Sequence, residues 1–168
     1  MEKKNSCAGA GFSTILWGVL AVLVVALMGS GCAGLMKPRI HRVTEDVFFV
    51  EVEEFTLTNA KVQELDNASG GKVVVLQDDT SRAEATVQLS KGNYQVTVYA
   101  LGPSSEEDAF YLTAGEQWEE RLWPTWTGEI LPAPDVSLTQ QADGPCKIVI
   151  RFAEPNVQLD RVEFKRVP

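Results

Sequence analysis

Histidine is nearly absent from this chain of 168 residues. The one histidine, His41, lies ahead of the segment that we expect to be the folded domain, so a histidine-based catalytic triad or zinc centre is not expected there. A phosphate-binding loop is not expected either. The glycines of "ASGG" (68–71) lack the Lys-Ser/Thr pair and the following helix that such a loop needs. We therefore do not expect an enzyme.

Cysteine is also scarce, and two of the three cysteines, Cys7 and Cys32, belong to the N-terminal segment. Cys146 is then left alone, and a single thiol cannot form an intrachain disulfide. Without a histidine partner, Cys146 is expected to be a small buried residue rather than a nucleophile. The domain must therefore be stabilised by its core or by a metal.

The N-terminal segment has the residue order of an export signal. Lys3 and Lys4 precede an apolar run over residues 15–28, which is followed by small residues and Cys32. The run is shorter than the roughly 20 residues of a spanning helix. A cysteine after small residues resembles the lipobox of bacterial lipoproteins, although Gly29 stands where leucine is usual. We expect a signal peptide over 1–31 and lipidation of Cys32; the alternative is an uncleaved anchor helix.

Lipidation at Cys32 would hold the chain on a membrane through a tether over residues 32–45. Ala33 follows Cys32, so the aspartate that retains many lipoproteins in the inner membrane of Gram-negative bacteria is missing, and we expect export to the cell envelope, at the outer membrane in such a species. Beyond residue 31 the chain carries 13 of the 15 basic and 22 of the 23 acidic residues, a net charge of −9. This charge argues against nucleic acid and anionic lipid headgroups as partners, and suits divalent cations and neutral ligands.

After residue 45 no helical period appears. Short runs of β-branched and aromatic residues alternate with turn signals about every 8–12 residues, which is typical of a sandwich or barrel. The nine expected strands cover residues 46–55, 60–65, 71–76, 84–89, 93–101, 109–114, 134–140, 146–153 and 157–167. They predict an all-β fold, an antiparallel β-sandwich over residues 46–168. Periodicity alone does not distinguish a jelly roll from an immunoglobulin-like topology.

Two segments between these strands have a distinctive composition. "QLSKGNYQV" predicts two strands of alternating pattern joined by a turn through residues 91–93. Residues 116–134 contain three of the four tryptophans and three prolines, and we expect them to form a long surface loop or edge, because proline removes donors from a strand ladder.

Four patterns occur in a familiar order over residues 48–167: "VEVEEF", "ASGGKVVVL", "LSKGNYQVTVYALG" and "IVIRFAEPNVQLDRVEFKRV". Together they resemble the carbohydrate-binding modules of families six and thirty-five, which are jelly-roll domains usually attached to glycoside hydrolases. The resemblance implies a jelly-roll β-sandwich that binds carbohydrate without catalysing a reaction.

The resemblance also implies a structural calcium that joins the first and last strands, with Glu51, Glu53 and Asp160 as ligands. The residues suit this role, because calcium takes six to eight oxygen ligands and residues one apart on a strand share a face. The alternative is a solvated strand face on which both glutamates are idle. Arg161 is expected on the opposite face from Asp160, where it would not compete.

For sugar binding, the resemblance implies aromatic platforms and nearby amide or carboxylate groups. The candidates are Trp118, Trp123 and Trp126; each is alternatively a core residue or a loop anchor. Trp118 alternates with its polar neighbours as a strand residue does, which favours the core, whereas Trp123 and Trp126 flank Pro124 and are expected in a loop. Asn156 and Gln158 are the polar candidates.

We therefore expect a membrane-tethered lipoprotein that binds a polysaccharide or cell-surface glycan. The alternative is a structural or protein-interaction lipoprotein that keeps the sandwich but has lost sugar binding. A third reading, a small glycosidase, needs two carboxylates roughly 5–10 Å apart across a cleft, and so small a sandwich rarely provides one.

Overall fold

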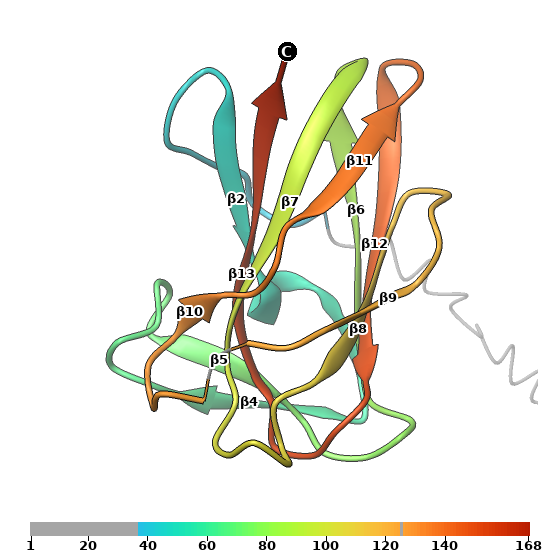
Figure 1. The fold of residues 1–168 in the computed structure, drawn as a ribbon. Helices are drawn as coiled ribbons and strands as arrows, with labels where there is room; N and C mark the ends of the chain where they lie inside the picture. The colour runs from blue at the N-terminus through green and yellow to red at the C-terminus, as the bar shows by residue number, and fades with distance from the viewer. Residues whose placement is uncertain (1–36, 125) are drawn as a thin grey trace, which may run out of the picture. The chain divides into compact units, whose positions relative to one another are not determined.

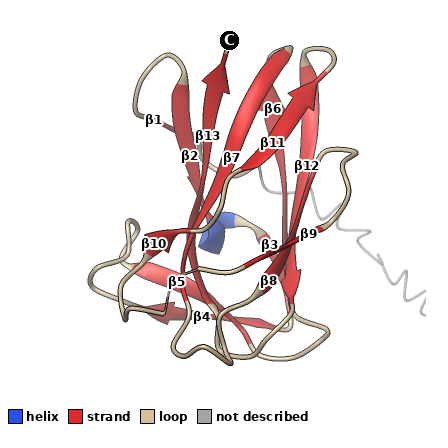
Figure 2. Cartoon of the chain, viewed as in Figure 1, coloured by secondary structure: helices blue, strands red, loops and turns tan. Residues whose placement is uncertain are grey.

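The computed structural model describes residues 37–124 and 126–168. The expected signal peptide over 1–31 and the expected lipidation site Cys32 lie outside the described residues. Within the described ranges the chain is built almost wholly of antiparallel strands, and its one helix is a 3-10 turn, η1 (Val52–Glu54) (Figure 2). No helix of this part of the chain is long and apolar enough to cross a membrane.

The strands form two sheets (Figure 1). The first, sheet A, contains β1 (His41–Arg42), β2 (Val47–Glu51), β4 (Ala60–Glu64), β5 (Lys72–Leu76), β7 (Gly92–Leu101), β10 (Leu131–Pro132), β11 (Val136–Gln140) and β13 (Gln158–Val167). The closing strand β13 organises this sheet, because it pairs with β2, with β7 and, at its first residues, with β5. The beginning and the end of the domain are thus neighbours.

Sheet B contains β3 (Thr56–Thr58), β6 (Arg82–Leu89), β8 (Phe110–Ala114), β9 (Glu120–Leu122) and β12 (Gly144–Phe152). Its strand order is β3-β6-β12-β8-β9, which places β9 at one edge.

The core lies between the sheets and is filled by the inward-facing residues of both. Phe48 and Phe164, directly opposite each other on β2 and β13, stack with ring centroids 5.0 Å apart. Ile148 and Ile150 on β12 are fully buried from the other side. Each such side chain contributes about 1.5–3 kcal/mol by burial. Cys146 is buried in the same core, as expected, and burial raises the pKa of its thiol to about 11.

The predicted antiparallel β-sandwich is confirmed, and every one of the nine predicted strands overlaps an observed one. The strands β1, β3, β9 and β10 were not predicted, because each is only two or three residues long and too short to show an alternating pattern. In the described residues of the segment 116–134 the strands are β9 and β10, as expected of a surface loop or edge.

The predicted turn at residues 91–93 is present, and it connects the two sheets. The strands on either side of the turn at 91–93 are present as β6 and β7, but β6 belongs to sheet B and β7 to sheet A. They do not form a hairpin with each other; the turn carries the chain from one sheet to the other. Alternation predicts the strands but contains no information on the sheet that each one joins.

Part of the segment expected to be a tether is packed against the sandwich. His41 and Arg42 form β1 and pair with β2, and the His41 ring stacks on Phe49 at 4.9 Å. Further upstream Pro38 is buried, and the Arg39 backbone N–H donates to the Glu54 carboxylate. Folded structure therefore begins before residue 46.

Candidate functional site

Four loops of the described chain meet at one end of the sandwich: residues 77–81, 102–109, 123–130 and 153–157. The register explains why, because Phe110 pairs with both Phe152 and Leu122, so that the loops attached to these residues emerge together. The backbone N–H of Phe152 donates to the Ser81 carbonyl at 3.1 Å, which adds the fourth loop. We call this end the loop edge; it lies at the bottom of Figure 1.

Glu154 links the loops of this edge. One of its carboxylate oxygens accepts the backbone N–H groups of Asp108 at 3.0 Å and Ala109 at 3.1 Å. The other oxygen forms an ion pair with Arg121. The guanidinium of Arg121 in turn lies over the Trp123 ring, 5.4 Å from its centroid. A half-exposed indole is thereby held in a defined orientation by a cation–π contact and a charge-assisted hydrogen bond.

A second polar pair lies beside this network. The side-chain amide of Asn156 donates to the Glu107 carboxylate at 2.8 Å, and Asn156 adopts a left-handed backbone conformation with φ 63°. Asparagine tolerates this conformation better than most residues. Asn156 is exposed in the loop, whereas Gln158 is half-buried at the first position of β13. Asn156 is therefore the better placed of the two polar candidates.

The three candidate tryptophans are all exposed, but not equally. Trp123 is 51% exposed and Trp126 is 61% exposed, and both lie in the loop after β9, as Pro124 suggested. Trp118 is 92% exposed, so the alternative that it is a core residue is wrong. The alternation around Trp118 is not that of a strand, because β9 begins only at Glu120.

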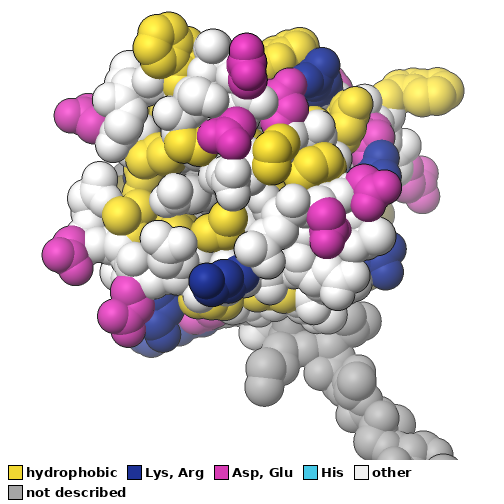
Figure 3. All heavy atoms as spheres, turned by 90° about the horizontal axis from the view of Figure 1, so that it is seen from below, with side chains coloured by type: hydrophobic (Ala, Val, Ile, Leu, Met, Phe, Trp, Pro, Cys, Tyr) yellow, Lys and Arg dark blue, Asp and Glu magenta, His cyan; other side chains and the backbone are white. Residues whose placement is uncertain are grey.

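Viewed from below Figure 1, the loop edge has apolar side chains interleaved with acidic ones, while basic side chains are few (Figure 3). Burial, followed by the charge of the neighbouring Glu154, raises the pKa of Asp108 above its ordinary value. Arg121 is the nearest counter-charge, and its ion pair with Glu154 neutralises it. The edge is suited to an uncharged ligand with apolar and hydroxyl groups.

Three residues of the loop edge were not predicted from the sequence. Arg121 and Glu154 lie 33 positions apart, and only the pairing of β8 with β9 and β12 brings them together. Glu107 belongs to an acidic run that looks like an ordinary solvated loop.

The second cluster of interest, the acidic junction, consists of Glu51, Glu53 and Asp160 with Ser69. Asp160 is fully buried and Glu51 is 5% exposed. The Ser69 hydroxyl contacts both carboxylates, at 2.7 Å from Glu51 and 2.9 Å from Asp160, and the Ser69 backbone N–H donates to Asp160 at 2.8 Å. Through Ser69, the loop "ASGG" thus joins β2 to β13.

Glu53 reaches the junction in a different way from the one predicted. The strand β2 ends at Glu51 and the chain turns through η1, so strand alternation is the wrong reason for the proximity of the two glutamates. Their approach is nevertheless close. A Cβ atom added at Gly70 would lie 2.4 Å from a Glu53 carboxylate oxygen and 3.4 Å from Glu51 Cδ, so glycine provides the space for both.

The environment of the acidic junction disfavours the ionised forms of its own glutamates. Burial is the main cause that raises the pKa values of Glu51 and Glu53, and the neighbouring carboxylates raise them further. The Glu53 Oε2 atom is buried, and no donor among the described residues bonds to it. Buried carboxylate oxygens without donors are costly unless a cation or proton satisfies them.

Arg161 contradicts its predicted position. Its guanidinium donates to the Asp160 carboxylate at 2.8 Å and lies 3.8 Å from the centroid of the Tyr99 ring. The register between β13 and β7 shifts between Leu159 and Arg161, and such a bulge disturbs the alternation on which the prediction rested. Arg161 therefore supplies positive charge to the junction.

The donor set of the junction fits calcium in its chemistry, since it offers carboxylate and hydroxyl oxygens and a net negative charge. The arrangement of these side chains is less favourable for an ion. In residues 37–124 and 126–168, no three histidine, cysteine, aspartate or glutamate side chains are grouped so that they could hold a metal ion. Ser69 and Arg161 take up oxygens that a cation would need.

No protein-family model and no curated protein matches the chain. Solved structures do match its fold. The family 35 carbohydrate-binding module from Clostridium thermocellum superposes with a TM-score of 0.58 at 17% identity, over 73% of this chain and 99% of that one. The C-terminal family 6 module of the laminarinase LamC from Zobellia galactanivorans superposes with a TM-score of 0.55 at 14% identity, over 72% and 100%.

Larger enzymes match in part. An exo-β-1,3-galactanase from Phanerochaete chrysosporium superposes with a TM-score of 0.56 at 16% identity, over 69% of this chain but only 28% of the galactanase. The chain thus spans less than a third of the length of that enzyme. The β-sandwich described above is the fold of carbohydrate-binding modules of the family 6 and family 35 type, which confirms the resemblance at the level of fold.

Proposed function

We propose that the chain is a non-catalytic glycan-binding protein and that its loop edge is the binding site. The observation that carries this proposal is the half-exposed Trp123 ring, fixed by Arg121 and Glu154 beside the exposed amide of Asn156. The C–H face of a pyranose packs well on an indole face, and a fixed ring loses little entropy when it binds. The modules with the same fold support the assignment to carbohydrate.

The polar groups around Trp123 suit sugar hydroxyls. Asn156 offers both a donor and an acceptor, and the carboxylates of Glu107 and Asp108 accept hydrogen bonds. Since Arg121 is neutralised by its ion pair, the site favours uncharged sugars over uronic acids. Trp126, in the same loop, is proposed as the second aromatic contact.

The structural contacts of Glu154 support the proposal of a non-catalytic role. Glu154 uses both of its carboxylate oxygens in structural contacts and so is not free to act on a substrate. A glycosidase needs one carboxyl group to donate a proton and another to attack or activate water, both free to face the substrate.

Calcium at the acidic junction is a further part of the proposal. Glu51, Glu53 and Asp160 would hold the ion, which would offset their repulsion and join η1 and β2 to β13. The orphaned Glu53 Oε2 and the space left by Gly70 support this assignment. Arg161 would have to leave Asp160, at least in part.

The membrane anchor is proposed from the sequence alone. Acylation of Cys32 would hold the glycan-binding domain at the surface of the cell envelope, with the outer membrane as the site in a Gram-negative species. Because Pro38 is buried and Arg39 bonds to Glu54, only a short segment would separate Cys32 from folded structure.

A glycan array with the purified chain at millimolar calcium tests the proposed function. We expect binding to neutral glycans that falls by about tenfold or more for Trp123→Ala. Trp126→Ala should weaken it less. Val43→Ala, at an exposed apolar residue in the turn before β2, is the control and should bind as the parent does. If no glycan binds, the glycan-binding proposal falls and the protein-interaction alternative takes its place.

A further inference from the structure

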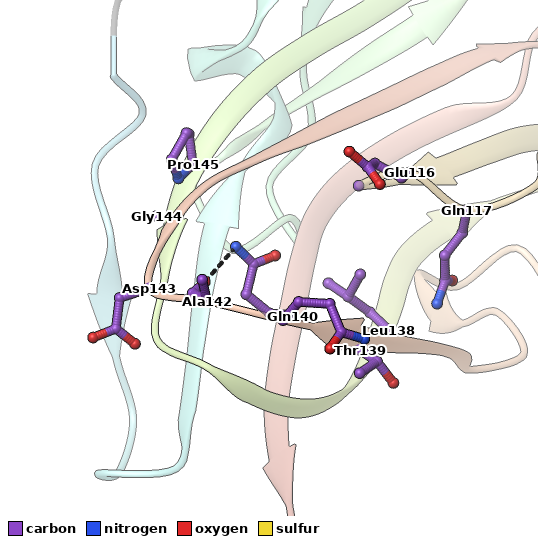
Figure 4. A pocket seen from close by; sticks show the side chains of 11 residues that line it. Glu116, Gln117, Leu138, Thr139, Gln140, Ala142, Asp143, Gly144 and Pro145 are labelled. Atoms are coloured by element: carbon purple, nitrogen blue, oxygen red, sulfur yellow. Dashed lines mark hydrogen bonds between the residues drawn. The ribbon is translucent and has the colours of Figure 1, made fainter.

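A polar groove lies away from the loop edge, between the turn after β8 and the turn that joins β11 to β12 (Figure 4). Its volume is about 550 Å³, which is in the range of small-molecule sites. The first turn connects two strands of sheet B, and the second carries the chain from sheet A to sheet B, so the groove runs over the side of the sandwich. None of the residues discussed for the loop edge lines it.

The turn that forms one wall is firmly seated. Gly115 has a φ of 67°, and an added Cβ would lie 3.2 Å from Leu138 and 3.6 Å from the sulfur of Cys146. The backbone N–H of Gly115 donates to the Lys147 carbonyl at 2.7 Å. Leu138 lines the groove beside this turn, so core residues support the wall directly.

Trp118 directly follows Gln117, the last residue of the turn after β8 that lines the groove. The next residue, Glu119, binds the Arg151 guanidinium with two hydrogen bonds of 2.6 and 2.5 Å. The short segment from Gly115 to Glu119 is therefore anchored at both ends. The Trp118 side chain is 92% exposed, so its ring is accessible to a ligand.

The lining chemistry identifies the class of ligand. Gln117, Thr139 and Gln140 present amide and hydroxyl groups, which donate and accept hydrogen bonds but carry no charge. Gln140 donates through Nε2 to the Ala142 carbonyl at 2.9 Å, which orients its amide (Figure 4). Of the described residues that line the groove, none is lysine or arginine, whereas Glu116 and Asp143 are acidic. Anionic ligands are thus disfavoured.

We propose that this groove, with Trp118 as its aromatic platform, is a second glycan-binding site and that it takes a neutral oligosaccharide. This inference takes the class of ligand, a glycan, from the proposed function, but the groove itself is identified independently of the loop edge. The three-residue strand β9 separates Trp118 from Trp123, so at most about 18 Å of chain lies between the two platforms. Two sites this close would raise the affinity for a polymer through multivalency.

Isothermal titration of the full chain with three neutral trisaccharides, namely β-1,3-galactotriose, β-1,4-mannotriose and laminaritriose, tests the proposal. We expect at least one to bind with two equivalents per chain, and trigalacturonic acid to bind at neither site. Trp118→Ala and Gln140→Leu should each remove one equivalent, and Trp123→Ala should remove the other. Trp118 is exposed, so its variant should keep the parent melting temperature, which is measured in parallel.

The outcomes separate the two proposals. If Trp118→Ala and Gln140→Leu leave stoichiometry and affinity unchanged while Trp123→Ala abolishes binding, the groove is overturned and the loop edge stands. If only the groove variants lose binding, the loop edge is overturned and the groove stands. If none of the trisaccharides binds, both are overturned.

Discussion

Arg161 donates a hydrogen bond of 2.8 Å to the carboxylate of its sequence neighbour Asp160, which is fully buried. Glu51 also bonds to Ser69 at this place, and Gly70 lies against Glu53, so the guanidinium brings positive charge to a cluster of acids. In the described part of the chain this pair therefore determines the charge balance where the first and last strands meet.

Replacement of Arg161 by methionine should destabilise the chain in the absence of calcium. The substitution keeps the apolar contact with Tyr99 but leaves a buried carboxylate without its positive partner, and breaking such a pair costs about 3 kcal/mol. Urea unfolding measures the change. Lys165→Met, on an exposed residue of the same strand, is the control and should change stability by less than about 0.5 kcal/mol. Equal stability of the two variants would show that Arg161 is not needed at the junction.

Calcium should raise the melting temperature of the parent chain, and a chelator should lower it again. A ligand at about 100 times its Kd adds about 2.7 kcal/mol of stability, which corresponds to a shift on the order of 5–10 °C. Arg161→Met should bind calcium more tightly than the parent, because no guanidinium competes for Asp160. Magnesium, which demands a smaller octahedral site, should produce a smaller shift. If calcium leaves the melting temperature of both chains unchanged, Glu51 and Glu53 are not calcium ligands.

Gly70→Ala should weaken the acidic junction without touching the core. The new methyl group would lie 2.4 Å from a Glu53 oxygen, so that side chain must move away from Glu51. We expect a loss of about 1–3 kcal/mol in calcium-containing buffer, as for other overpacked sites, and the loss of most of the calcium-dependent shift. Differential scanning calorimetry with and without calcium measures both. A Gly70→Ala chain with the parent's full calcium response would remove Glu53 from the proposed ligand set.

The sequence predicts the strands of this fold well and the long-range contacts less well. Alternation and turn residues are local signals, and they identify the nine longer strands. The junction between Glu51 and Asp160, more than 100 positions apart, was expected only because the chain resembles a family in which these strands meet. Ser69, which bonds to both acids, lies within the "ASGG" pattern of that resemblance, and this was the available signal for its role.

The errors share a physical origin. Trp118 and Arg161 were both assigned from alternation, which holds only inside a regular strand. Trp118 precedes β9, and Arg161 follows a bulge. The Glu154 network depends on the register of sheet B, which no local pattern encodes.

Cys146 should be inert in the folded chain. Burial raises the pKa of its thiol to about 11, so at pH 8 almost none of it is the reactive thiolate. In a chain with Cys7→Ser and Cys32→Ser, we expect no reaction with an aromatic disulfide reagent at pH 8 until denaturant is added, and full reaction afterwards. Rapid labelling of the native chain would mean that the core around β12 opens readily.

Glu154→Gln should impair glycan binding while the sandwich stays folded. The neutral amide keeps the shape of the side chain but loses the charge that holds Arg121, and with it the support of the Trp123 ring. Because Arg121 and Glu154 are both partly exposed, the loss of stability should be small, about 1 kcal/mol. We expect titration with a neutral trisaccharide to show weaker binding at the loop edge and unchanged binding in the Trp118 groove. Glu119→Gln removes the partner of Arg151 at the residue that follows Trp118, and it should produce the reverse pattern. If both variants bind as the parent does, the two ion pairs do not orient the tryptophans, and Trp123 and Trp118 must be positioned by their own backbone.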